Sequence, residues 1–336
     1  MAFQTGTAAD AQDFYDKLET FLTTNADLMA ASQNWTVVWQ RPSGGAHPGD
    51  KVLKGPGLAG TDNIYVGMRL NIDDNNDEYS ISLSGATGVL QSATWFDQHQ
   101  HTSPKTVRAF LDNDPMQYWM IANGRRFAFV VRIGTVFEHA YAGLFLPYGT
   151  PQEYPYPMFV GGTARGLDAG NNGRTNSYRD TNEEHVLYMK SPVRTENQIV
   201  LSNGYVMLPD NSWIAIGPYS DNVTAFLSFI PEEDDHRNLL GNELFNNENH
   251  VGAYYLMDRM MEGYGGVHAT VPLVIARTIG DTALNATSYG YLDGVHRCQG
   301  HNMAAMDTIQ SGSASELVFP NIFRTGLEHF YALRME

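Results

Sequence analysis

The sequence predicts a mainly β protein, built of antiparallel, β-sandwich-like sheets with a short N-terminal helix. Of its 336 residues, 32 are glycine, 12% are aromatic and only 17% are charged. Glycine favours tight turns and aromatic residues favour strands, so this composition is typical of many strands joined by short turns. Apolar residues make up 43% of the chain, which argues against a disordered acidic chain.

One helix is expected at the front of the chain, over about residues 8–24. Phe14, Leu18 and Phe21 recur there at helical spacing, which places them on one face. Thr7 and the following Asp10 resemble a capping box at the helix start. The simplest role for this segment is a helix that packs on a sheet through its apolar stripe.

After this helix the apolar period changes to the alternation of strands. Asn123-Gly124 lies between two such runs and is a strong hairpin signal. No helix-length crossover separates the runs, so an antiparallel meander is expected. The expected strands are 35–39, 63–70, 78–83, 118–121, 126–133, 136–146 with a bend at Gly143, 205–208, 212–216, 224–230, 271–275, 289–292, 316–319 and 329–334.

The pattern divides the chain into three parts. Residues 1–162 are expected to form the N-terminal helix plus a β domain. Residues 163–185 are polar, rich in Gly and Asn, and have no apolar period, which indicates a loop or linker. Residues 186–336 are expected to form a second β-rich region that can pack with the first.

Composition excludes several classes of protein. The net charge of −16 argues against a nucleic-acid-binding protein, which needs a basic face. The single cysteine, Cys298, excludes an internal disulfide and a cysteine-based zinc site. The N-terminus does not read as a signal peptide, and no apolar run is long enough to span a bilayer, so no membrane partner is expected.

The sequence has few motifs that carry chemistry. His99 and His101 form an HxH pair that could meet one metal ion, but no third ligand is evident, so a polar turn is favoured. The acidic runs 73–78 and 232–235 lack the glycine and distal glutamate of a calcium loop and are also interpreted as turns. We therefore expect no enzyme activity, no cofactor and no bound metal.

The most distinctive segment is 140–162, in which four prolines fall between Pro147 and Pro157. Proline prevents continuous strand pairing and holds the backbone extended, so this segment is stiff. A stiff aromatic edge suits a protein–protein contact, but it could equally be an internal brace over its own core. The candidate interface residues, including two from the apolar C-terminal segment, are Tyr148, Tyr154, Pro155, Tyr156, Pro157, Phe330 and Tyr331.

Several short phrases accompany this segment. They are Phe3–Ala8 before the helix and Trp35–Val37, Gly55–Gly57 before Ile64–Gly67, Trp119 with Ala122–Arg126, and Phe319–Thr325 with Tyr331–Arg334. In these phrases the chain resembles virion structural proteins of tailed bacteriophages, of the kind found in the tail and baseplate. The likeness consists of short phrases spread along the whole chain, and it implies no active-site residues.

This resemblance implies a structural component of the virion tail that joins tail parts by protein–protein contacts. The expected partners are other virion structural proteins and further copies of the chain in a symmetric assembly, formed in the host cytoplasm. Three alternatives stay open: a neck, collar or fibre-attachment protein; a carbohydrate-binding protein of the host surface; and a glycan hydrolase.

Overall fold

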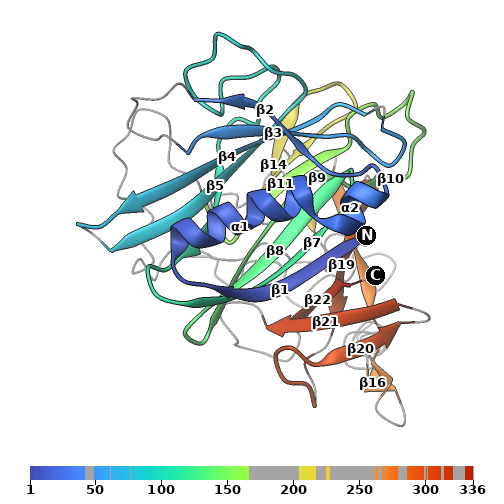
Figure 1. Ribbon diagram of the computed structural model, residues 1–336. Helices are drawn as coiled ribbons and strands as arrows, with labels where there is room; N and C mark the ends of the chain where they lie inside the picture. The colour runs from blue at the N-terminus through green and yellow to red at the C-terminus, as the bar shows by residue number, and fades with distance from the viewer. Residues whose placement is uncertain are drawn as a thin grey trace, which may run out of the picture.

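The computed structural model describes residues 1–335 apart from 42–48, 61, 76, 166–203, 217–224, 228–261, 264–266, 269, 279–285, 299, 301, 312–313 and 321–329. The described chain is mainly β, with antiparallel sheets and a short N-terminal helix, as the sequence predicts (Figure 1). The predicted turn at 232–235 lies outside the described residues, as does most of the predicted loop 163–185.

The smaller of the two main sheets is a meander. Its strand order is β12-β6-β5-β4-β3-β2, with every pair antiparallel. The acidic run 73–78 is the hairpin turn between β4 and β5, whose end residues Asp73 and Glu78 are paired. The strands are β2 (Thr36–Gln40), β3 (Lys51–Gly55), β4 (Ile64–Asp73), β5 (Glu78–Ala86), β6 (Val107–Leu111) and β12 (Ala164–Arg165).

The larger sheet has 14 strands among the described residues, in the order β1-β7-β8-β9-β11-β13-β14-β15-β18-β19-β22-β21-β20, with β10 beside β19. The predicted hairpin at Asn123-Gly124 joins β7 to β8, and the Asn123 N–H donates to the Arg126 carbonyl at 3.0 Å. One pair, β14 with β15, is parallel rather than antiparallel. The strands are β1 (Ala2–Ala8), β7 (Met116–Ala122), β8 (Arg126–Ile133), β9 (Val136–Leu144), β10 (Leu146–Pro147), β11 (Met158–Gly162), β13 (Gly204–Met207), β14 (Trp213–Ile216), β15 (Ala225–Leu227), β18 (Val271–Thr278), β19 (Ala286–Cys298), β20 (Thr308–Ser311), β21 (Ala314–Pro320) and β22 (Phe330–Arg334). A separate small hairpin pairs β16 (Glu262–Gly263) with β17 (Val267–His268).

The N-terminal helix begins later than expected. Helix α1 spans Ala11–Thr24 and is capped by Asp10, whose carboxylate accepts the Asp13 N–H at 2.8 Å. The predicted cap, Thr7, instead lies in the edge strand β1, which sequence reasoning missed. A second short helix, α2 (Ala26–Ala30), follows directly. Figure 1 shows α1 lying between the strands of the two main sheets.

Two apolar cores explain why the larger sheet is buried on both faces. One core lies between α1, the smaller sheet and one face of the larger sheet, and it includes Phe14, Leu18 and Phe129. The other lies on the opposite face and includes Phe159 together with Leu292 and Tyr331 from the C-terminal strands. Strands β11 and β13 pair directly, so one continuous sheet joins the predicted N-terminal domain to the second β-rich region.

Candidate functional site: an anchored aromatic arch

The proline- and tyrosine-rich segment forms an arch, residues 145–157, between β9 and β11. Its base is closed where the Phe145 N–H donates to the Pro157 carbonyl at 2.8 Å. Its first leg, β10, pairs with β19 through Leu146 and Tyr291. Gly290 permits this approach, because a β-carbon there would lie 2.2 Å from the Leu146 carbonyl oxygen. The arch is therefore tied to a strand far away in the sequence.

The top of the arch is a hydrogen-bonded turn. The Thr150 N–H and hydroxyl both donate to Glu153 Oε2 at 2.9 Å. The Tyr154 N–H donates back to the Thr150 carbonyl at 2.9 Å. The hydrogen bonds from Thr150 also hold the pKa of Glu153 below its ordinary value, because they stabilise the charged carboxylate. These contacts fix the top of the arch, which has no regular secondary structure.

Tyr154 is the internal anchor of the arch. Its ring is 3% exposed and packs against Phe145 and Tyr289, with ring centroids 5.4 and 6.2 Å apart. Its hydroxyl donates a hydrogen bond to the Met207 carbonyl of β13. Burial raises the pKa of Tyr154, so the phenol stays protonated and keeps this bond. Within this chain, Tyr154 therefore braces the arch against the interior.

The outer side of the arch presents Tyr148 to solvent. Tyr148 is 60% exposed, the largest value among the large hydrophobic side chains of the described residues. Its ring lies 6.0 Å from the half-buried ring of Tyr291, and its N–H donates to the Tyr289 carbonyl at 2.9 Å. Pro151 and Pro155 are exposed on the same arch. The arch thus combines an exposed ring with a backbone that is already ordered.

The seven predicted interface residues do not form one surface. Tyr148 and Pro155 are exposed, and Tyr156 and Phe330 are half-buried. Tyr154, Pro157 and Tyr331 are buried within the chain, and their role in a partner contact stays a prediction. Each of the three fills the chain's own interior, where packing, not exposure, fixes its ring.

The C-terminal segment is an internal strand rather than a free edge. Tyr331 of β22 packs against His139 and Phe319, with ring centroids 4.6 and 5.8 Å apart. Strand β22 is hydrogen-bonded on both sides, to β19 and β21. Its backbone is therefore satisfied within the sheet, and only its two ends reach the surface, where Phe330 is half-buried and Arg334 is exposed.

The two histidines of the HxH pair lie in different surroundings. His99 is buried, accepts the Leu90 N–H on Nδ1 at 3.1 Å, and packs edge-on against Trp39. Burial lowers the pKa of His99, which favours the neutral ring. His101 is exposed, as the interpretation of a polar turn expects. Within the described part of the chain, no three His, Cys, Asp or Glu side chains are placed to hold a metal ion.

A second cluster, which sequence reasoning missed, lies on the outer face of the smaller sheet. Asp50 is fully buried and accepts two hydrogen bonds from Arg69, at 2.8 and 2.6 Å. The guanidinium groups of Arg41 and Arg69 lie 4.1 and 4.7 Å from the centre of the Trp95 ring. Burial raises the pKa of the neighbouring Asp97. This cluster holds the loop that carries Trp95 onto the sheet, which is a structural role.

Tyr289 and Tyr291 are the site residues that the sequence does not identify. Their spacing places both rings on one face of a strand, and this was the only available signal. Nothing in the sequence indicates that this face meets the arch, because the pairing joins residues 146–147 to 290–291. Long-range pairing of this kind depends on the whole sheet.

No family model matches the chain, and no curated protein matches its sequence. None of the helices in the described ranges has the length and apolar character needed to cross a membrane.

Proposed function

We propose that this chain is a structural component of a bacteriophage virion, in the tail or baseplate, that joins tail parts through protein–protein contacts. One observation carries the proposal: the exposed Tyr148 on an arch that is anchored at its base, at its top and through Tyr154. An aromatic side chain on an ordered backbone loses little entropy on docking, and tyrosine is enriched among residues that dominate interface energies. The end-to-end resemblance in short phrases supplies the virion context.

The position in the particle can be tested by labelling. Purified phage particles that contain this chain would be labelled with an antibody raised against it and viewed by negative-stain electron microscopy. We expect label at the distal end of the tail. Label at the head–tail junction would support the neck or collar alternative, and absence of label from intact and disrupted particles would contradict a virion role.

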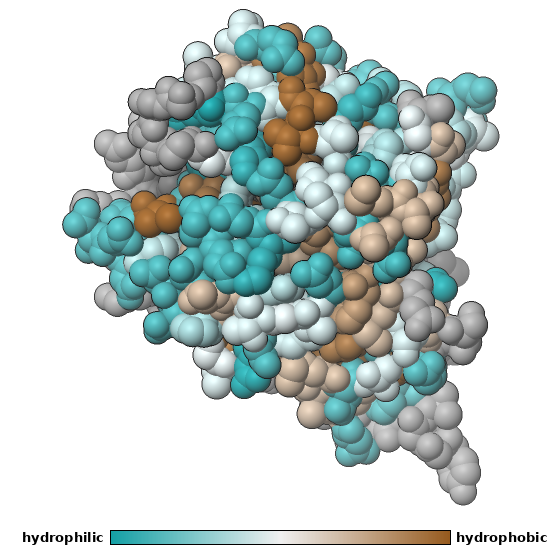
Figure 2. Space-filling model, viewed as in Figure 1, coloured by the Kyte–Doolittle hydropathy of each residue, from teal (hydrophilic) through white to brown (hydrophobic). Residues whose placement is uncertain are grey.

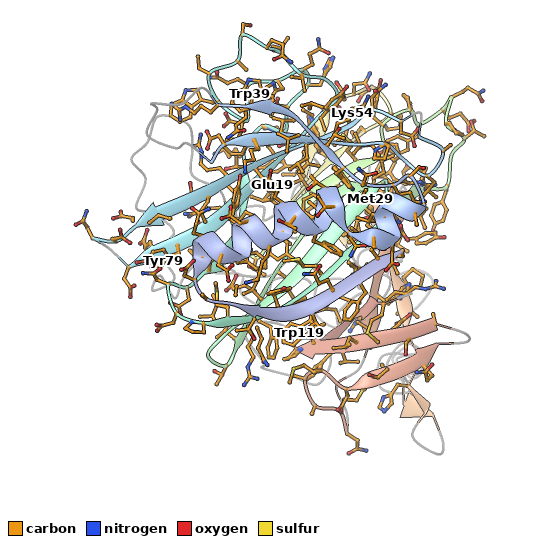
Figure 3. The ribbon with its side chains drawn as sticks, in the orientation of Figure 1. Glu19, Met29, Trp39, Lys54, Tyr79 and Trp119 are labelled. Carbon is orange, nitrogen blue, oxygen red and sulfur yellow. The ribbon has the colours of Figure 1, made fainter. Side chains whose placement is uncertain are left out.

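The role of the arch can be tested by replacing Tyr148. Tyr148→Ala should lower the amount of the chain incorporated into particles by about tenfold or more, because an interface tyrosine often contributes over 1.4 kcal/mol. Met29→Ala is the matched control, since Met29 of α2 is 55% exposed and belongs to another surface (Figure 3). Incorporation of Y148A at the wild-type level would contradict contact through the arch.

The paired rings of Tyr148 and Tyr291 also favour a second function, binding of a host-surface carbohydrate. Tyrosine rings can pack against the apolar face of a sugar while their hydroxyls stay hydrated. A glycan array probed with the purified chain separates the two functions. Binding that is lost in Y148A would favour the carbohydrate function, whereas an array without signal, together with failed incorporation of Y148A, would favour the structural one.

A further inference from the structure

Strand β1 is an open edge of the larger sheet. It pairs with β7 along its whole length, from Ala2 opposite Ala122 to Ala8 opposite Met116, without a register shift. No other described strand or loop makes a backbone hydrogen bond to Ala2–Ala8. In Figure 1, β1 lies below α1. Its outward N–H and C=O groups can therefore accept another strand.

The edge of β1 lacks the features that normally prevent such pairing. Its sequence, Ala-Phe-Gln-Thr-Gly-Thr-Ala, contains no charged residue and no proline. Thr5 and Thr7 are exposed, and Figure 2 shows a pale strip along β1, below the teal surface of α1. Proteins commonly protect edge strands with lysine, proline, a bulge or a very short strand.

Among the described residues, the other edge strands of the two main sheets are better protected against pairing with another chain. Strand β2 carries a bulge between Val37 and Trp39, which interrupts a regular ladder. Strand β12 has 2 residues and β20 has 4, which is too short for an extended ladder. Strand β1, with 7 regularly paired residues, is the edge best suited to accept a partner.

We propose that β1 is a self-association site, at which the β1 strands of two copies of this chain pair antiparallel about a two-fold axis at Thr5. The sequence is self-complementary in this register, because Ala2 faces Ala8, Phe3 faces Thr7, Gln4 faces Gly6, and Thr5 faces itself. Such a contact is isologous and joins the two large sheets into one. The inference does not depend on the proposed function of the arch.

Charge favours this antiparallel arrangement for two acidic chains. Asp10 and Asp13 begin α1, just beyond the C-terminal end of β1. Antiparallel pairing places these carboxylates at opposite ends of the contact, separated by more than about 20 Å at 3.3 Å per residue. Their repulsion would then be largely screened at ordinary salt. A parallel contact would bring the same carboxylates together.

The first test introduces a charge at the centre of the contact. Sedimentation velocity of the purified full chain should show a monomer–dimer equilibrium that depends on protein concentration. Thr5→Lys should weaken the dimer at least tenfold, because two ammonium groups would face each other across the axis. Thr36→Lys is the matched control, since Thr36 is an exposed threonine on the other edge strand, β2. A wild-type chain that stays monomeric throughout would overturn the proposal.

Thr5 also donates a hydrogen bond to the Tyr118 carbonyl at 2.9 Å, so T5K could affect folding. A second variant, Thr5→Cys, tests the register directly. Facing residues of an antiparallel pair have Cα atoms about 4.5–5.5 Å apart, which suits a disulfide. The native Cys298 is buried, so a disulfide-linked dimer of T5C would identify the axis at Thr5. The proposal would be overturned if T5C formed no disulfide-linked dimer, or if Thr36→Cys formed one to the same extent.

Discussion

At the residue scale, the most consequential side chain is a buried carboxylate, Glu138 of β9. Its Oε2 accepts the Thr163 hydroxyl and the Phe110 N–H at 3.3 Å. Its Oε1 is buried and has no hydrogen-bond partner among the described residues. Burial raises the pKa of Glu138 to about 7, more than the bonds from Thr163 and Phe110 lower it.

This pKa makes the stability of the fold depend on pH. The folded chain holds the Glu138 proton more tightly than the unfolded chain, whose carboxyl has an ordinary pKa of 4.5. Below that ordinary pKa the carboxyl is protonated in both states, so its burial costs no charge. The free energy of unfolding then falls as the pH rises from there through about 7. The penalty at alkaline pH is roughly 3 kcal/mol, at 1.36 kcal/mol per pKa unit.

Glu138→Gln should remove this pH dependence. The amide stays neutral, so the variant should gain on wild type by roughly 3 kcal/mol at pH 8.5 and by little at pH 4. The measurement is urea unfolding at both pH values. Burial lowers the pKa of His139 to about 3, so this residue makes the fold less stable at acid pH. Wild type and E138Q share this effect, and it cancels when their free energies of unfolding are subtracted. Asp114→Asn, at an exposed position, is the control, and an equal gain in both variants would contradict this account.

At the scale of elements, the arch depends on Tyr154. Tyr154→Ala should cost about 3–5 kcal/mol, because it removes a buried ring from between Phe145 and Tyr289. Tyr154→Phe should cost about 1–2 kcal/mol through the lost bond to the Met207 carbonyl. Tyr148→Ala should stay within about 0.5 kcal/mol, as expected for an exposed side chain. Urea unfolding of the three variants checks this order, and a neutral Y154A would mean that the ring is not an anchor.

The sequence predicts elements well where the apolar pattern is regular. The strand 126–133 and its Asn123-Gly124 hairpin are found as predicted, because the turn and the alternation agree. Strand β1 was missed because its Ala and Gly residues give weak strand signals, although β7 supplies the pairing that forms it.

The arch shows where sequence reasoning stops. Alternating Tyr and Pro indicates a stiff segment, but the same pattern suits an exposed edge and a buried brace. Tyr148 is exposed and Tyr154 is buried. They differ because of how each ring meets Tyr291 and Tyr289 of β19, which lie beneath the arch. The burial of each ring is therefore decided by a strand pairing that no local pattern contains.

At the scale of the whole molecule, the turn between β7 and β8 joins the parts of the chain. The Trp35 indole N–H donates to the Asn123 carbonyl at 2.9 Å, and the Gly57 N–H donates to the Gly124 carbonyl at 2.7 Å. From the C-terminal region, Asp293 of β19 accepts the Arg126 Nε–H at 3.2 Å and the Asn123 side-chain amide at 2.9 Å. Burial alone would raise the pKa of Asp293, but Arg126 and Asn123 hold it below its ordinary value.

Breaking this junction should destabilise both regions together. Asp293→Ala leaves the fully buried Arg126 without its carboxylate, so it should cost about 3–5 kcal/mol. The double variant R126M/D293A should lose less than D293A alone, because it no longer buries an unpaired charge. Hydrogen exchange of β8 and β19 should then accelerate by similar factors in D293A. Faster exchange in β19 with unchanged β8 would mean that the two regions unfold separately, despite the sheet that connects them.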